Sequence, residues 1–77
     1  MLINIIIFGR LAEIIGRSSL ELEHVRDTDQ LQQMLRDQYP LLATVNYRLA
    51  VDRQLVDENT SLSGYSTVAL LPPFSGG

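Results

Sequence analysis

The chain has 77 residues, the size of one small domain, and a domain of this size buries only about 60% of the surface that its unfolded chain exposes. Hydrophobic residues make up 45% of the sequence, which is enough for one compact core and too many for intrinsic disorder. A net charge of −3 without a basic stripe argues against nucleic acid as a partner. The sequence has no cysteine and one histidine, which excludes disulfide scaffolds, thiolate catalysis and the usual metal sites. No apolar run is long enough to span a membrane, so we expect a cytoplasmic protein.

The first predicted element is a strand over residues 2–8, an apolar segment rich in β-branched residues that ends at Gly9. Alternate side chains of a strand point to opposite faces, which divides the segment into two sets. The set assigned to the core is Ile3, Ile5 and Ile7. The set that faces outward is Asn4, Ile6 and Phe8.

A short helix and a second strand follow. Apolar residues recur at helical spacing within residues 10–15, and Gly16 is placed to end this helix in a left-handed conformation. Residues 19–23 alternate apolar and polar side chains, the pattern of a half-exposed antiparallel strand. The first two strands are therefore expected to pair as a hairpin.

The main helix is expected to begin at Asp27 or Thr28, either of which can cap it. It should end before Pro40, because the residue that precedes a proline disfavours helical angles. Its apolar stripe consists of Leu31, Met34, Leu35 and Tyr39. This stripe predicts one amphipathic helix packed on a sheet.

Three further strands are predicted, over residues 47–51, 54–56 and 67–71. A turn at Asp52-Arg53 joins the first two, and a polar loop with one apolar anchor leads to the third. This order of elements indicates an α+β domain of the ubiquitin-like β-grasp class, in which a mixed sheet of four to five strands wraps one main helix. The first and last strands of that fold are parallel neighbours, and both are strongly apolar here.

The end of the sequence carries the most informative pattern. The last strand runs directly into Pro72 and Pro73, which lack an amide hydrogen, end the hydrogen-bond ladder and hold the chain extended. The sequence then finishes on Gly76 and Gly77. Because glycine lacks a Cβ, such an end can thread a narrow channel into an enzyme that activates its carboxylate. We therefore expect a β-grasp domain over residues 1–71 and an extended tail over residues 72–77; the alternative is a frayed end without function.

Three stretches, at residues 8–16, 49–56 and 68–77, carry a family resemblance. They read FGRLAEIIG, LAVDRQLV and VALLPPFSGG. Over its full length the chain resembles the small subunit of molybdopterin synthase, a MoaD-type sulfur carrier of the MoaD/ThiS family. Three residues depart from those usual in that family: Asp52, Tyr65 and Phe74. Phe74 bears on which partner accepts the tail.

The resemblance implies a cycle in which an ATP-dependent adenylating enzyme, related to ubiquitin-activating enzymes, forms an acyl-adenylate on Gly77. Sulfur transfer would then convert this group to a thiocarboxylate. The tail, with Gly76 behind the reacting carbon, would enter the large synthase subunit and donate sulfur for molybdopterin within a heterotetramer. The catalytic side chains would belong to the partners. We expect no stably bound cofactor, since the activating enzyme uses the ATP.

Periodicity also predicts a partner surface beside the tail. In the last strand Val68 and Leu70 are assigned to the core, so Ala69 and Leu71 point outward beside Ile6 of the neighbouring strand. The candidate partner-binding residues are Phe8, Leu55, Leu71, Pro72, Pro73, Phe74 and Ser75. Exposed apolar patches on small domains mark interfaces, and the resemblance implies contacts with both partners on this face. The alternative is that Phe8 and Leu71 belong to the core.

Three other functions remain open. A sulfur carrier for thiazole formation in thiamine synthesis would share the fold and the Gly-Gly end, although such carriers generally lack the Pro-Pro pair and the Phe-containing opening. A ubiquitin-like modifier would use the same adenylation but would end joined to lysines of other proteins. A pure interaction domain would keep its function without Gly77.

Overall fold

The computed structural model describes residues 2–64 and 66–72 of the chain. The elements in chain order are β1 (Leu2–Ile7), α1 (Arg10–Ile15), β2 (Ser19–Glu23), α2 (Thr28–Gln38), the 3-10 helix η1 (Pro40–Thr44), β3 (Arg48–Val51), β4 (Gln54–Val56) and β5 (Thr67–Leu71). Every predicted strand and helix is present, with bounds that differ from the prediction by a residue at most. The 3-10 helix was not predicted. Pro40 ends α2 as expected, and its fixed φ also suits the first position of η1.

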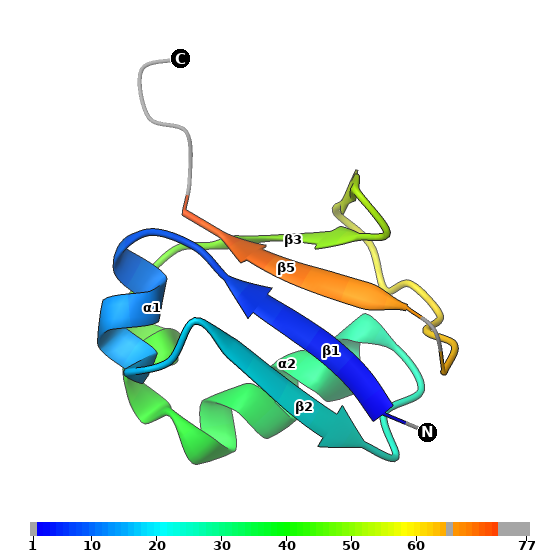
Figure 1. Cartoon of the computed structure of the whole chain (residues 1–77), viewed down its shortest axis with the longest axis horizontal. Coiled ribbons are helices and arrows are strands. Elements are labelled where there is room, and N and C mark those ends of the chain that lie inside the picture. The colour runs from blue at the N-terminus through cyan, green and yellow to red at the C-terminus, as the bar shows by residue number, and fades with distance from the viewer. Residues whose placement is uncertain (1, 65, 73–77) are drawn as a thin grey trace.

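The five strands form one mixed sheet in the order β2-β1-β5-β3-β4. β1 pairs antiparallel with β2 and parallel with β5, and β3 pairs antiparallel with both β5 and β4. Figure 1 shows β1 and β5 side by side at the centre of the sheet, with α2 crossing behind the strands. A mixed sheet with parallel first and last strands and one main helix is the predicted ubiquitin-like β-grasp.

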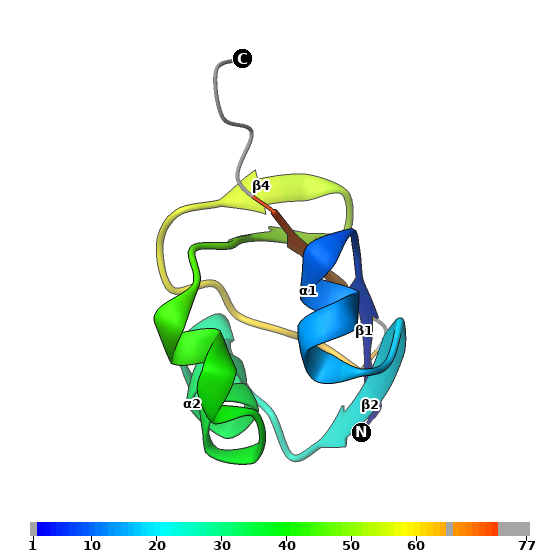
Figure 2. The same cartoon turned by 90° about the vertical axis from the view of Figure 1, so that its left-hand side faces the viewer.

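The helices lie on one side of the curved sheet, and the apolar core fills the space between them (Figure 2). The fully buried strand residues are Ile3, Ile5, Val68 and Leu70. Leu31 and Leu35 of α2 are fully buried as well, while Met34 and Tyr39 pack against the core from its edge. The predicted periods of two in the strands and 3.6 in the helix are therefore confirmed. Within the described residues, no helix is long and apolar enough to cross a membrane.

The start of α2 is held at two points. Asp27 is the capping residue, and its carboxylate accepts a hydrogen bond from the Gln30 amide at 2.8 Å. Asn59, in the loop before β5, accepts one from the Asp29 amide at 2.9 Å. The same loop is anchored by Leu62, which is buried as predicted. These contacts tie the helix to the segment that leads into β5.

Candidate functional site

The outer face of the sheet, opposite the helices, carries a row of apolar side chains across four strands. In register order this row is Ile6 on β1, Ala69 on β5, Ala50 on β3 and Leu55 on β4. Ile6 and Leu55 are 39% and 47% exposed, whereas the two alanines between them are more covered. The outward side of the sheet thus presents large apolar side chains on either side of two small ones.

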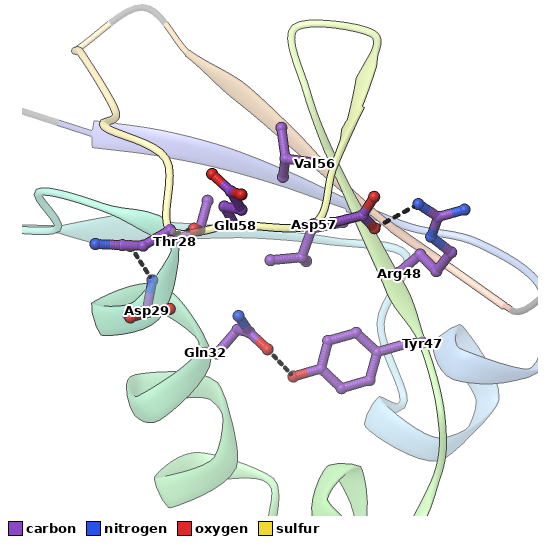
Figure 3. A pocket seen from close by; sticks show the side chains of 10 residues that line it. Thr28, Asp29, Gln32, Tyr47, Arg48, Val56, Asp57 and Glu58 are labelled. Carbon is purple, nitrogen blue, oxygen red and sulfur yellow. Dashed lines mark hydrogen bonds and ion pairs between the residues drawn. The ribbon is translucent and has the colours of Figure 1, made fainter.

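A second row lies nearer the end of β5. Phe8, the residue after β1, donates its amide to the Leu70 carbonyl at 3.1 Å, and its side chain is 46% exposed. Leu71 stands opposite Arg48 on β3. The Arg48 guanidinium in turn contacts the Asp57 carboxylate at 2.6 Å, as Figure 3 shows. The apolar side chains of this row therefore end at Leu71, beside a charged pair that also lines a hollow next to α2.

We call Ile6, Phe8, Ala50, Leu55, Ala69 and Leu71 the outer apolar face. Away from the chain end it is bounded by polar residues, since Asn4 lies opposite both Glu21 and Thr67. The Thr67 amide also donates to the Asp52 carboxylate at 2.9 Å. The apolar surface is thus confined to the part of the sheet from which the chain leaves β5.

A hollow of about 530 Å³ opens over the centre of the outer apolar face. It is lined by the apolar side chains of the face and by a polar border, namely Ile6, Phe8, Ala50 and Ala69 together with Asp52, Arg53 and Thr67. A hollow lined by apolar side chains beside charged ones suits a projecting apolar side chain of a protein partner. The face therefore has the form of a docking surface.

The chain leaves this face at Pro72, the last residue that the structure describes. Pro72 is half-buried and packs against Gly9, where an added Cβ would lie 3.3 Å from the proline Cγ. Gly9 has φ 59° and ψ −138°, angles that residues with a side chain rarely adopt. The residues after the ends of β1 and β5 are therefore in contact.

A second hollow, of about 210 Å³, lies between α2 and the β3–β4 hairpin (Figure 3). Several of its polar groups bond to one another: the Tyr47 hydroxyl donates to Gln32 Oε1 at 3.2 Å, and Arg48 donates to the Asp57 carboxylate. In residues 2–64 and 66–72 no buried side-chain nitrogen or oxygen lacks a partner, and no cluster of three His, Cys, Asp or Glu could hold a metal. We assign a structural role to this hollow.

The predicted site residues fall into two groups. Phe8 and Leu55 are exposed, and Leu71 and Pro72 are half-buried at the same end of the sheet. The alternative that placed Phe8 in the core is therefore wrong. The other predicted residues lie outside the described part of the chain; they are Pro73, Phe74, Ser75, Gly76 and Gly77.

The sequence analysis missed Ala50 and the contact made by Gly9. Ala50 could have been found by counting back from the Asp52-Arg53 turn, because a two-residue loop places it opposite Leu55. The contact of Gly9 with the end of β5 had no comparable local signal.

The structure is that of a ubiquitin-like β-grasp domain whose last strand carries part of the outer apolar face. A family model described as the ThiS family matches residues 5–77, and the chain belongs to this family. The resemblance noted in the sequence is thereby confirmed.

Two curated relatives are molybdopterin synthase sulfur carrier subunits. The chain is 26% identical over 81 residues to the protein from Caenorhabditis briggsae, and 25% identical over 81 residues to that from Caenorhabditis elegans. Each alignment covers 97% of this chain and 96% of the relative. The similarity thus extends over nearly the whole of both chains.

Solved structures give the same picture. The chain matches a protein in the complex of subunits 1 and 2 of molybdopterin-converting factor from Helicobacter pylori, with 26% identity, a TM-score of 0.75 and 100% of both chains covered. It also matches small archaeal modifier protein 1 from Methanosarcina acetivorans, with a TM-score of 0.83, 20% identity and coverage of 99% of this chain and 96% of the other. The second match shows a shared fold.

Proposed function

We propose that this protein is the sulfur carrier that acts as the small subunit of a molybdopterin synthase in the cytoplasm. One observation carries the proposal. β5 contributes Ala69 and Leu71 to the outer apolar face and leads through Pro72 directly into the segment that ends in Gly76 and Gly77. In this proposal a surface that docks on a partner lies five residues or fewer from an end suited to that partner's channel. The similarity to sulfur carrier subunits over 97% of this chain supports the proposal.

The chemistry of the tail follows from the poor electrophilicity of a carboxylate. In the proposed cycle a carboxylate oxygen of Gly77 attacks the α-phosphorus of ATP on an adenylating enzyme, and pyrophosphate leaves. Hydrosulfide (HS⁻) then attacks the carbonyl carbon of the acyl-adenylate, the C–O bond to AMP breaks, a proton is lost, and a thiocarboxylate remains. Only the carboxylate of this chain reacts. The catalytic side chains and the bound ATP belong to the partner, and this chain supplies docking and delivery.

The outer apolar face is proposed to dock on the large synthase subunit. The Helicobacter pylori structure that the chain matches is a complex of two subunits of molybdopterin-converting factor, which supports an assembly of this kind. The same face lies beside the root of the tail, so we propose that the adenylating enzyme uses it as well. The two partners would then bind in turn, because both need the same residues and the same tail.

Two other functions share part of this chemistry. The match to an archaeal modifier protein at 20% identity concerns the fold alone, so a modifier is an outcome that experiment must separate. A carrier for thiazole formation would also undergo adenylation and sulfur transfer. A modifier would yield isopeptide conjugates with other proteins, and a thiazole carrier would fail to bind the large synthase subunit. These products and partners differ even though the activated end is the same.

The chemical test is the intact mass of the protein after incubation with ATP, the cognate adenylating enzyme and a sulfur source. We expect a gain that matches replacement of one oxygen by sulfur, and no gain when Gly77 is deleted. If the mass stays constant with an enzyme that is competent on another carrier, the sulfur-carrier function is excluded.

The partner is tested separately by binding to the large synthase subunit. Phe8→Ala and Leu55→Ala should each weaken the complex by about fivefold or more, as truncation of buried interface anchors does. Leu41→Ala is the matched control, because Leu41 is 60% exposed on η1 and is not part of the outer apolar face. Equal affinity for all three variants would exclude the outer apolar face as the docking surface.

A further inference from the structure

We infer that Gly9 is a positioning residue for the tail. Its missing side chain lets Pro72 pack against the backbone that follows β1, and this contact sets the direction in which the chain leaves β5. The contact itself is independent of any activity, whereas its consequence for the reaction rests on the proposed function.

The backbone at Gly9 is the first part of the argument. The chain turns there from β1 into α1, and the Gly9 carbonyl accepts the Ala12 amide at 3.1 Å. One residue earlier, the Phe8 amide donates to the Leu70 carbonyl at 3.1 Å, so this turn is attached to the end of β5. With φ 59° and ψ −138°, Gly9 occupies a region that is essentially restricted to glycine. The turn therefore depends on this residue.

The contact with Pro72 is the second part. An added Cβ at Gly9 would lie 3.3 Å from Pro72 Cγ and 3.9 Å from Cδ, so the proline ring would have to move by a few tenths of an ångström. The ring is part of the backbone of Pro72 and fixes its φ, so a displaced ring displaces the chain that follows it. Five residues follow Pro72 and end in the carboxylate of Gly77, so the contact lies at the base of the segment that must reach the partner.

Gly16, at the other end of α1, shows that the contact is specific to Gly9. Gly16 also has a positive φ, of 83°, and it ends the same helix. An added Cβ there would meet nothing within 4 Å. The two glycines thus share a need for unusual backbone angles, and only Gly9 touches the root of the tail.

The consequence for the reaction follows from what each part of the protein does. The outer apolar face docks on the partner, whereas the direction of the tail decides whether the carboxylate reaches the reacting phosphate. Misplacing a reacting group by about 1 Å can cost up to about 100-fold in rate. A change at Gly9 should therefore lower the rate of adenylation within the complex more than the affinity for the enzyme.

The first experiment compares Gly9→Ala with Gly16→Ala. ATP–pyrophosphate exchange with the cognate adenylating enzyme is measured as a function of carrier concentration, at a temperature where circular dichroism shows every variant folded. We expect Gly9→Ala to lower kcat about tenfold with KM within about twofold, and Gly16→Ala to change neither. Equal kcat values for the two variants would overturn the inference.

A double-mutant cycle separates the contact from the backbone strain. In a Pro72→Ala background the ring that Gly9 touches is absent, so the further effect of Gly9→Ala on kcat should shrink to the part caused by backbone angles. If Gly9→Ala has the same effect with and without the proline ring, the contact with Pro72 has no role in positioning.

A structural readout keeps the inference testable without activity. The sequence has no cysteine, so Gln38→Cys and Ser75→Cys provide the two attachment points for spin labels. We expect Gly9→Ala, and not Gly16→Ala, to shift the distance distribution between the labels. If Gly9→Ala shifts the label distance but the wild-type chain is not adenylated, the proposed function is excluded and the positioning role of Gly9 stands. A reactive wild type with neither a shift nor a loss of kcat would remove the positioning role alone.

Discussion

Ala50 and Ala69 lie directly opposite each other across β3 and β5, and both line the hollow at the centre of the outer apolar face. Ile6 and Leu55 extend the same cross-strand row on either side. Because a methyl group is the smallest apolar side chain, this pair leaves room for a partner side chain between larger neighbours. The shape of the proposed docking surface thus depends on two small residues.

Filling this hollow with a charged side chain should prevent docking. Ala69→Arg is expected to weaken binding to the large synthase subunit at least about tenfold, because it places a cation in an apolar contact. The free energy of unfolding of the Ala69→Arg variant should differ from that of the wild type by less than about 1 kcal/mol, since the long arginine side chain can reach water. Titration calorimetry and urea denaturation measure the two quantities. Leu41→Arg, a charge added to η1, is the control; unchanged affinity of the Ala69 variant would exclude the hollow from the interface.

The β3–β4 turn contains strain that a glycine should relieve. Asp52 and Arg53 have φ values of 49° and 72°, and positive φ at both central residues is the mark of a type I′ turn, which favours glycine at the second position. We expect Arg53→Gly to raise the free energy of unfolding by about 1 kcal/mol, measured by urea denaturation. Arg36→Gly makes the same substitution within α2, where glycine should cost about 1 kcal/mol. Destabilisation of both variants would show that the turn is unstrained.

The polar contact between α2 and the loop before β5 should depend on the Thr28 hydroxyl. Thr28 is 2% exposed, and its Oγ1 accepts the Thr60 amide at 2.9 Å and lies 3.4 Å from Asn59 Oδ1. Thr28→Val keeps the shape but leaves the Thr60 amide without its partner, so we expect a loss of about 1–3 kcal/mol in thermal or urea denaturation. Thr44→Val removes an exposed hydroxyl on η1 and should cost less than about 1 kcal/mol. Equal losses would contradict a special role for the buried contact.

Burial should decide the effect of the same truncation in two strands. Leu70 of β5 is fully buried, whereas Leu55 of β4 is 47% exposed. Leu70→Ala is expected to cost about 2–5 kcal/mol, which is a large share of the stability of so small a domain. Leu55→Ala should cost less than about 1 kcal/mol. Urea denaturation monitored by circular dichroism measures both, and similar losses would show that the core does not lie where the structure places it.

Local patterns were sufficient for most of the secondary structure. The alternation of Ile3, Ile5 and Ile7 with polar and outward residues identified the buried face of β1, because the strand period is two whatever its neighbours are. η1 was missed because Pro40 was treated only as a helix terminator. A proline also fits the first turn of a new helix, and the sequence after it has no clear period.

The candidate site was predictable in part for the same reason. Phe8 was assigned correctly to the outward face from strand alternation, and Leu55, expected to complete the apolar patch, is exposed. The functional roles of the residues after Pro72 stay predictions. Asn59 was not identified as a partner of α2, because no sequence pattern marks a loop side chain whose oxygen accepts a hydrogen bond from a distant backbone amide.

The sequence by itself therefore determined which side chains of β1 and β5 are buried, the position of the two-residue turn between β3 and β4 and the Gly-Gly end. These properties depend on neighbours along the chain, where geometry is set by strand alternation and by a two-residue turn. Only the tertiary structure decided how β1 and β5 align, and hence that Gly9 touches Pro72. The two strands are separated by most of the chain, so no turn sets their register. Core packing on the two helices sets it instead, and that packing is a property of the whole fold.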